Sequence, residues 1–231
     1  MRVKDESLYA AEALLRIHDK NGNFISPAEA IPILEESGLI IPVGKWIIQN
    51  AFSMCTECRK YYPEFRVSIN LSYVQILKSP LMMELKQIID HSGISCSGII
   101  VELTESGYLE GTPAVRSVWN DMKKLRIQIA LDDFGTGYSN LMNISNLEPD
   151  IVKLDRGFTL KALSRSYEYQ LMQYVIEMVH KLNQYVCVEG VETKEDLEKI
   201  KALGPDLIQG YYYSKPCSRD EFLKKFFGYS E

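Results

Sequence analysis

The chain has 231 residues, of which 46% are hydrophobic and 25% charged, and its net charge is −5. This composition is ordinary for a soluble globular protein, and no apolar run approaches the roughly 18 residues of a membrane-spanning helix. The negative charge argues against DNA or another broad nucleic-acid partner, because duplex binding usually requires a basic face. The first residues lack the apolar stretch of a secretory signal, so the expected compartment is the cytoplasm.

The elements expected along the chain alternate between strands and helices. Residues 7–17 read as a strand, and Ser26, Pro27 and Glu29 then predict a helix start with an N-cap, a first-turn proline and a capping box. Further strands are expected at 65–70, 99–103, 127–132, 151–154, 185–188 and 207–209. Helices are expected at 26–37, after Pro42, after Pro80, and at 113–125, 167–183, 194–203 and 218–227.

Five cysteines fit reduced thiols in a cytoplasmic protein. Cys55 and Cys58 form the only close pair, and they fall within an expected helix with no second pair nearby. The spacing therefore favours buried or surface thiols over a zinc or redox site.

Seven short apolar runs each stop at one polar or ionisable residue. These residues are Glu12, Asn70, Glu102, Asp132, Lys153, Glu189 and Gln209. Parallel strands covered by helices read as near-continuous apolar runs, and their C-terminal ends meet at one rim. The sequence therefore predicts an α/β fold, a TIM-like (β/α) barrel formed by a single domain over residues 1–231, with the functional residues on that rim.

Seven strands are one fewer than a closed eight-stranded barrel requires, and the first expected strand begins within ten residues of Met1. We therefore expect the missing element to lie upstream, so that the chain is N-terminally truncated. An open barrel leaves unpaired strand edges, which proteins normally avoid. Either another chain fills the gap or the sequence is a fragment of a longer gene product.

The rim residues Glu12, Asn70, Glu102 and Asp132 offer only oxygen ligands, and Asp133 stands beside the last of them. Hard oxygen donors without histidine or cysteine suit Mg²⁺ or Mn²⁺ rather than zinc. Each carboxylate taken singly is more often a surface or salt-bridged residue than a metal ligand. Five such ligands from four strands favour a bound cation, because their negative charges would otherwise repel one another.

Two further rim residues suggest chemistry on a phosphate group. The ammonium of Lys153 could orient a water or hold a phosphate oxygen, or it could form a structural ion pair with Asp132 or Asp133. Glu189 is placed as a general base or a further ligand. Glu192, three residues further on, could belong to the same site or could as easily be the first-turn acid of the next helix.

Arg16 follows Glu12 by four residues, which predicts that both side chains share a strand face and that the arginine can bind a phosphate. Residues 131–141 form the most distinctive loop, in which Gly135 and Gly137 permit unusual backbone angles and let amides face a ligand. The loop lacks the third glycine of a dinucleotide fingerprint and follows an acidic pair that no such fingerprint has.

These motifs together resemble the successive motifs of the EAL-domain family, which are cyclic di-GMP phosphodiesterases. The matching segments are Glu12-Ala13-Leu14-Leu15-Arg16, Ser68-Ile69-Asn70-Leu71-Ser72, Glu102-Leu103-Thr104-Glu105-Ser106, residues 132–139, Lys153-Leu154-Asp155, residues 189–193 and Gln209-Gly210-Tyr211. The resemblance covers essentially the whole chain in the family's order. One departure is that the family's first helix, and the strand ending in Gln-Pro-Ile, are not found here.

The resemblance implies a role for each matching residue. One divalent ion, Mg²⁺ or Mn²⁺, would be held by Glu12, Asn70, Glu102 and Asp132, and Asp133 would help to hold a second. Lys153 and Glu189 would position and activate the attacking water. Arg16, Leu15 and Gln209 would contact the substrate. Glu105 would anchor the loop that includes Phe134, Gly135, Thr136 and Gly137, and Glu192 would be a further active-site residue.

The activity implied is hydrolysis of one phosphodiester bond of cyclic di-GMP, giving linear pGpG by a two-metal strategy. An alternative is a non-catalytic cyclic di-GMP receptor, and a third hypothesis is another barrel metalloenzyme or a structural partner. The resemblance also implies a homodimer, formed through surfaces near the helices after the strands of Asp132 and Lys153 and coupled to the loop. A sensory or diguanylate-cyclase-like domain is expected upstream in the full-length protein.

Overall fold

The computed structural model describes residues 1–104, 112–136 and 147–228. The chain divides into two compact units. The first unit holds Ala11–Leu103 and the described residues up to Ile127, and the second holds Met1–Ala10, Thr104 and the described residues from Gln128 on. The prediction that residues 1–231 form one domain stays a prediction.

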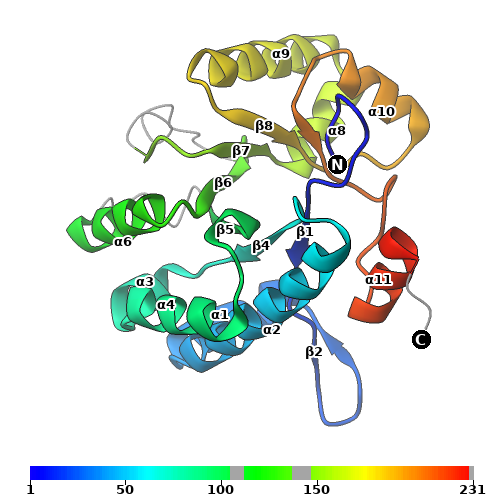
Figure 1. Cartoon of the computed structure of the whole chain (residues 1–231). Coiled ribbons are helices and arrows are strands. Elements are labelled where there is room, and N and C mark those ends of the chain that lie inside the picture. The colour runs from blue at the N-terminus through cyan, green and yellow to red at the C-terminus, as the bar shows by residue number, and fades with distance from the viewer. Residues whose placement is uncertain (105–111, 137–146, 229–231) are drawn as a thin grey trace. The chain divides into compact units, whose positions relative to one another are not determined.

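The first unit combines strands with covering helices (Figure 1). Its elements are β1 (Ala10–Ala13), β2 (Ile17–His18), β3 (Phe24–Ile25), α1 (Pro27–Glu36), α2 (Ile40–Tyr61), β4 (Arg66–Asn70), α3 (Tyr73–Lys78), α4 (Leu81–Ser92), the 3₁₀ turn η1 (Cys96–Gly98), β5 (Ile99–Thr104) and α6 (Pro113–Lys124). The strand order is β1–β4–β5. β4 and β5 run parallel, and their register sets Asn70 opposite Glu102.

The core of the first unit forms where α2 packs against β4 and α4. Ile48, Phe52 and Cys55 lie one helical turn apart on α2 and are buried, so they form one apolar stripe. Phe65 and Ile69, just before and within β4, are also buried. This packing fixes β4, and with it the position of Asn70 at the end of the strand.

The second unit contains the remaining strands in parallel, in the order β6–β7–β8–β9 (Figure 1). Its elements are β6 (Gln128–Phe134), β7 (Ile151–Leu154), α8 (Arg156–Ser164), α9 (Ser166–Lys181), β8 (Tyr185–Val188), α10 (Lys194–Lys201), β9 (Leu207–Ile208) and α11 (Arg219–Phe227). At the start of the chain, Arg2 forms an antiparallel bridge with Leu207 of β9. Every residue of β7 is buried, as expected for a strand covered by helices.

Most of the expected elements are confirmed, and three details are wrong. The strand expected over residues 7–17 is shorter, because regular pairing is confined to Ala10–Ala13. The helix expected after Pro42 begins earlier, at Ile40, because a proline in the first turn has no amide hydrogen to leave unsatisfied. Ser26 is the N-cap residue of α1, but its side chain makes no capping hydrogen bond, so the expected box with Glu29 does not form.

Several elements were not expected from the sequence, namely α3, α8, η1 and the β2–β3 hairpin. The hairpin pairs Ile17 with Ile25 and His18 with Phe24. Its tip is closed by Asp19, whose carboxylate accepts hydrogen bonds from the backbone amides of Asn21 and Asn23, each 2.8 Å long, and from the side chain of Asn23. The hairpin tip is therefore held by contacts within itself.

Within the described residues, no helix is both long enough and apolar enough to cross a bilayer. All five cysteines are free thiols, and Cys55 and Cys58 are both buried. Cys55 is fully buried, and its Sγ lies 3.5 Å from the carbonyl oxygen of Gly98. Burial raises the pKa of the Cys55 thiol to about 11.

We predict that Cys217 reacts with a thiol reagent at pH 8 while Cys55 stays unmodified in the folded protein. Cys217 is exposed, whereas Cys55 is buried and remains protonated far below its pKa of about 11. Time-resolved alkylation followed by peptide mass spectrometry measures both rates, and the same reaction in denaturant is the control. Equal rates in the folded protein would contradict the burial of Cys55.

Candidate functional site

A β-bulge in β6 places two aspartates against one lysine. Leu131 pairs with Val152 and Phe134 pairs with Leu154, so Asp132 and Asp133 together lie opposite Lys153 of β7. The extra residue is accommodated by Asp133, whose φ of 59° is in the left-handed region. A bulge of this kind breaks the regular alternation of a strand and re-aims its side chains.

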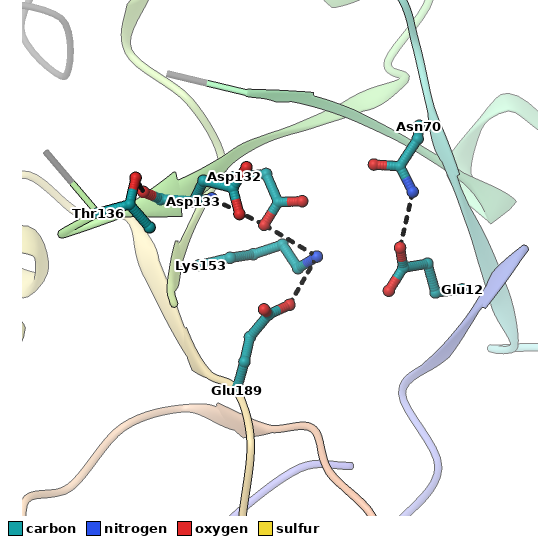
Figure 2. Close-up of polar contacts among 7 residues, drawn as sticks. All are labelled: Glu12, Asn70, Asp132, Asp133, Thr136, Lys153 and Glu189. Carbon is teal, nitrogen blue, oxygen red and sulfur yellow. Dashed lines mark hydrogen bonds and ion pairs between the residues drawn. The ribbon is translucent and has the colours of Figure 1, made fainter. Parts of the chain in front are cut away.

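Lys153 forms ion pairs with carboxylates from both neighbouring strands (Figure 2). Its Nζ lies 3.1 Å from Oδ1 of Asp132 and 2.8 Å from Oε1 of Glu189, the residue that follows β8. The lysine side chain is only 4% exposed. The ion pair with Asp132 that the sequence left open is therefore formed, and Glu189 is a second partner that the sequence did not suggest.

One oxygen of Asp132 stays available for a ligand. Oδ1 accepts hydrogen bonds from Lys153 and from the backbone amide of Asp133, the latter 2.9 Å long. Oδ2 receives no hydrogen bond from the residues that the structure describes. A carboxylate oriented at one oxygen and open at the other is a suitable ligand for a cation.

A second group of polar residues lies in the first unit. Nδ2 of Asn70 donates a 2.7 Å hydrogen bond to Oε1 of Glu12 (Figure 2), and Asn70 is paired in register with Glu102 of β5. Because the amide nitrogen of Asn70 is engaged by Glu12, its amide oxygen is the end that remains for a cation. Glu102 is a buried carboxylate.

The donor chemistry of both groups fits a hard divalent ion. Asp132, Asn70, Glu12 and Glu102 supply carboxylate and amide oxygens, the ligands that Mg²⁺ and Mn²⁺ prefer. Over residues 1–104, 112–136 and 147–228, no three His, Cys, Asp or Glu side chains form a ready-made metal cluster. The features that favour a metal are therefore the type of donor and the open oxygen of Asp132.

The residues expected to contact a substrate lie just beyond strand ends. β1 ends at Ala13, so the expectation that Arg16 shares its strand face with Glu12 is wrong. Arg16 is exposed, donates a hydrogen bond to the carbonyl oxygen of Leu15 at 2.9 Å, and lies over the ring of Phe24. Gln209 directly follows β9, where its backbone amide donates to the carbonyl oxygen of Val188 at 2.9 Å.

The described part of the loop after β6 is supported by local contacts. Phe134 is buried, and Thr136 donates through Oγ1 to the carbonyl oxygen of Asp133 at 3.0 Å. Gly135 has a φ of +102°, and a Cβ built there would lie 3.0 Å from the ring of Phe158. Glu105, which is expected to anchor this loop, and Gly137, which is expected within it, lie outside the described residues.

The loop after β8 holds Glu192, which does not belong to the first turn of the next helix. α10 is capped by Thr193, whose hydroxyl accepts from the amide of Asp196, so Glu192 precedes the helix and the first-turn interpretation is wrong. Instead, Glu192 accepts hydrogen bonds from Nε and Nη2 of Arg156 at 3.2 and 2.8 Å. Sequence reasoning missed Arg156; its only signal is its place directly after the N-cap Asp155 of α8.

Comparison with known proteins gives one consistent result. The model of the family described as "EAL domain" matches residues 1–216. The cyclic di-GMP phosphodiesterase PdeF of Escherichia coli K12 is 32% identical over 205 residues, which cover 89% of this chain. The alignment takes up 27% of PdeF, so the chain spans about a quarter of that relative's length.

Solved structures agree with this result. The EAL enzyme Bd1971, in a form with cAMP and cyclic di-GMP bound, matches with a TM-score of 0.91 and 29% identity, covering 97% of this chain and 62% of that one. The MucR phosphodiesterase in complex with cyclic di-GMP matches with a TM-score of 0.85 and 27% identity, covering 92% of this chain and 86% of that one. These matches confirm the expected TIM-like α/β fold class.

We predict that Gly190→Ala destabilises the protein more than Gly204→Ala does. Both glycines have a positive φ, +77° and +74°, so an alanine costs about 1–2 kcal/mol of backbone strain at either position. A Cβ at Gly190 would also lie 2.3 Å from Cγ of Arg156, whereas Gly204 faces open space. Overpacking should add about 1–3 kcal/mol to the loss at Gly190.

The measurement is urea unfolding of the wild type and both variants, compared through the free energy of unfolding. Gly204→Ala is the matched control, because it carries the backbone cost without the steric clash. Equal losses in the two variants would show that Arg156 does not pack against Gly190.

Proposed function

The chain belongs to the EAL domain family, and from this membership we propose that it hydrolyses cyclic di-GMP to linear pGpG with the help of Mg²⁺ or Mn²⁺. Relatives named as cyclic di-GMP phosphodiesterases support the substrate. The observation that carries the proposal is the pairing of Lys153 with Asp132 and Glu189. These are a cation, a metal ligand and a base in the arrangement that water-driven phosphodiester cleavage needs.

In the proposed reaction, Glu189 is the general base. Its carboxylate accepts a proton from the attacking water, and the ammonium of Lys153, 2.8 Å away, fixes the orientation of that carboxylate. Lys153 also offers positive charge to the phosphate oxygens as negative charge builds on them. Because Lys153 is buried among its partners, little rearrangement is needed when the reaction begins.

The proposed metal ligands are the oxygen donors identified above. Glu12, Asn70, Glu102 and Asp132 would hold one ion, and Asp133 would help to hold a second. When bound, such ions polarise the scissile phosphate and lower the pKa of a coordinated water. Arg16, Leu15 and Gln209 are the proposed substrate contacts, and Arg16 can reach a phosphate because its guanidinium is exposed.

We also propose that the chain forms a homodimer through α9. Tyr167, Leu171 and Tyr174 follow one another at helical spacing on one face of α9. Tyr167 is 75% exposed and Tyr174 is 67% exposed, so both large side chains lie mostly in solvent. An apolar stripe of this kind is typical of an interaction surface. A sensory or cyclase-like domain upstream in the full-length protein stays a prediction.

We predict that Glu189→Gln lowers turnover of cyclic di-GMP by about 10² or more while the affinity for the nucleotide stays within about threefold. The amide keeps the shape of the side chain and can still accept from Lys153, but it cannot take a proton. Release of pGpG measured by chromatography, together with calorimetric binding of cyclic di-GMP, tests this. Glu195→Gln, at an exposed position of α10, is the matched control.

The first comparison in that experiment is the wild type with and without Mg²⁺ or Mn²⁺. Turnover that requires the ion supports the proposal. Tight binding without turnover would instead indicate a cyclic di-GMP receptor, and unchanged turnover in Glu189→Gln would remove that residue from the proposed role.

We predict that Asp132→Ala and Asn70→Ala weaken Mn²⁺ binding by about tenfold or more, since each removes a proposed oxygen ligand. Calorimetric titration with Mn²⁺ in the absence of nucleotide measures this directly. Asp121→Ala is the control, because Asp121 pairs with Lys124 at the surface of α6. Equal affinities in all three variants would contradict the ligand assignment.

We predict that Leu171→Glu shifts the chain from dimer to monomer, because it places a charge within the apolar stripe of α9. Sedimentation velocity over a range of protein concentrations measures the shift. Met83→Glu on α4 replaces another exposed apolar residue and should leave the dimer intact. A wild type that is monomeric throughout the range would overturn the proposed dimer.

A further inference from the structure

The side chain of Arg156 covers the turn that follows Glu189. Gly190 has a φ of +77°, and a Cβ built on it would lie 2.3 Å from Cγ and 2.8 Å from Cβ of Arg156. The arginine stem therefore lies directly on the backbone of Gly190. Only a residue without a side chain fits between Arg156 and this turn.

The guanidinium of Arg156 extends beyond Gly190 and binds the far end of the turn. Nε and Nη2 both donate to Oε1 of Glu192, at 3.2 and 2.8 Å. Arg156 is the first residue of α8, and Asp155 before it caps that helix by accepting from the amides of Gly157 and Phe158. The base of the arginine is thus fixed by the helix, and its tip is fixed by Glu192.

The turn has anchored ends and an intrinsically flexible centre. The backbone amide of Glu189 donates to the carbonyl oxygen of Leu154 at 3.1 Å. The backbone amide of Val191 donates to the carbonyl oxygen of Gln209 at 3.4 Å. Glycine between these two anchors has the widest choice of backbone angles of any residue. A change of conformation at Gly190 would move the carboxylate of Glu189 relative to Lys153.

We propose that Arg156 is a positioning residue for Glu189: by clamping the turn over Gly190, it keeps the Glu189 carboxylate 2.8 Å from Lys153. This role rests on the proposed function of Glu189 as the general base. Arg156 acts through the turn and touches neither Glu189 nor Lys153 in the described contacts. Its effect is on the geometry of proton transfer, where displacements of about 1 Å cost up to about 10²-fold in rate.

The ion pair between Arg156 and Glu192 is exposed, and this allows a positioning role to be distinguished from a purely structural one. The side chains of Arg156 and Glu192 are 57% and 38% exposed, and pairs as exposed as this contribute little to folding. Loss of the clamp should therefore leave global stability nearly unchanged. The effects should appear in turnover and in the local protection of the turn.

The test compares Arg156→Met and Arg156→Lys with Lys199→Met. Methionine keeps an unbranched stem over Gly190 but cannot bind Glu192, lysine restores the charge, and Lys199 pairs with Glu195 on α10 away from the turn. We expect kcat for cyclic di-GMP to fall about tenfold in Arg156→Met with KM within about twofold, and to recover in Arg156→Lys. A higher KM with unchanged kcat would make Arg156 a substrate contact and overturn the proposal.

Hydrogen exchange followed by mass spectrometry gives a readout that does not depend on activity. Peptides covering residues 185–193 should exchange several-fold faster in Arg156→Met than in Lys199→Met or the wild type, with equal thermal melting of all variants. Unchanged exchange would overturn the clamp. If the wild type shows no turnover, the proposed function fails, and the exchange data still decide whether Arg156 holds the turn.

Discussion

A buried ammonium between two carboxylates sets the geometry of the second unit. Lys153 of β7 pairs with Asp132 of β6 on one side and with Glu189, the residue directly after β8, on the other. Side chains from three neighbouring strands and their ends therefore meet at one ammonium. Burying a lysine is costly unless its charge is matched, and two carboxylates more than match it. Oδ2 of Asp132, which accepts no hydrogen bond from the described residues, is the oxygen of this group that we propose as a ligand for a cation.

The first turn of α8 supports the loops on both sides of this group. Phe158 packs against Gly135 in the loop after β6, and Arg156 lies on Gly190 in the loop after β8. In both loops a glycine with positive φ makes the close approach possible. α8, the helix that follows Lys153, thus contacts the loop after Asp132 and the loop that begins at Glu189. One short segment of chain therefore supports both carboxylate partners of the lysine.

The sequence was most informative about strand ends. Asn70, Lys153 and Glu189 were expected at the C-terminal ends of buried strands, and they lie within or directly after β4, β7 and β8. This succeeded because strands buried on both faces leave an unbroken apolar run that stops where the strand stops. The fold class followed from the alternation of those runs with helices and was confirmed by the solved structures.

The sequence was least informative where a single backbone angle or a tertiary contact decides the outcome. The bulge at Asp132 and Asp133 depends on one left-handed residue, which no apolar pattern reveals. Arg16 was misplaced because the chain leaves β1 after Ala13 and enters a hairpin, although the apolar pattern continues. The contact between Arg156 and Glu192 joins residues 36 positions apart, so it is visible only in three dimensions.

The β2–β3 hairpin is a place where the fold can accept a change of chain length. Because Asp19 satisfies the amides at the tip from within the hairpin, the tip needs no support from the strands or helices around it. A doubling of loop length costs only about 0.6 kcal/mol of closure entropy. Descendants of this gene can therefore lengthen or shorten the chain at this hairpin, and acquire new surface there, without disturbing the core.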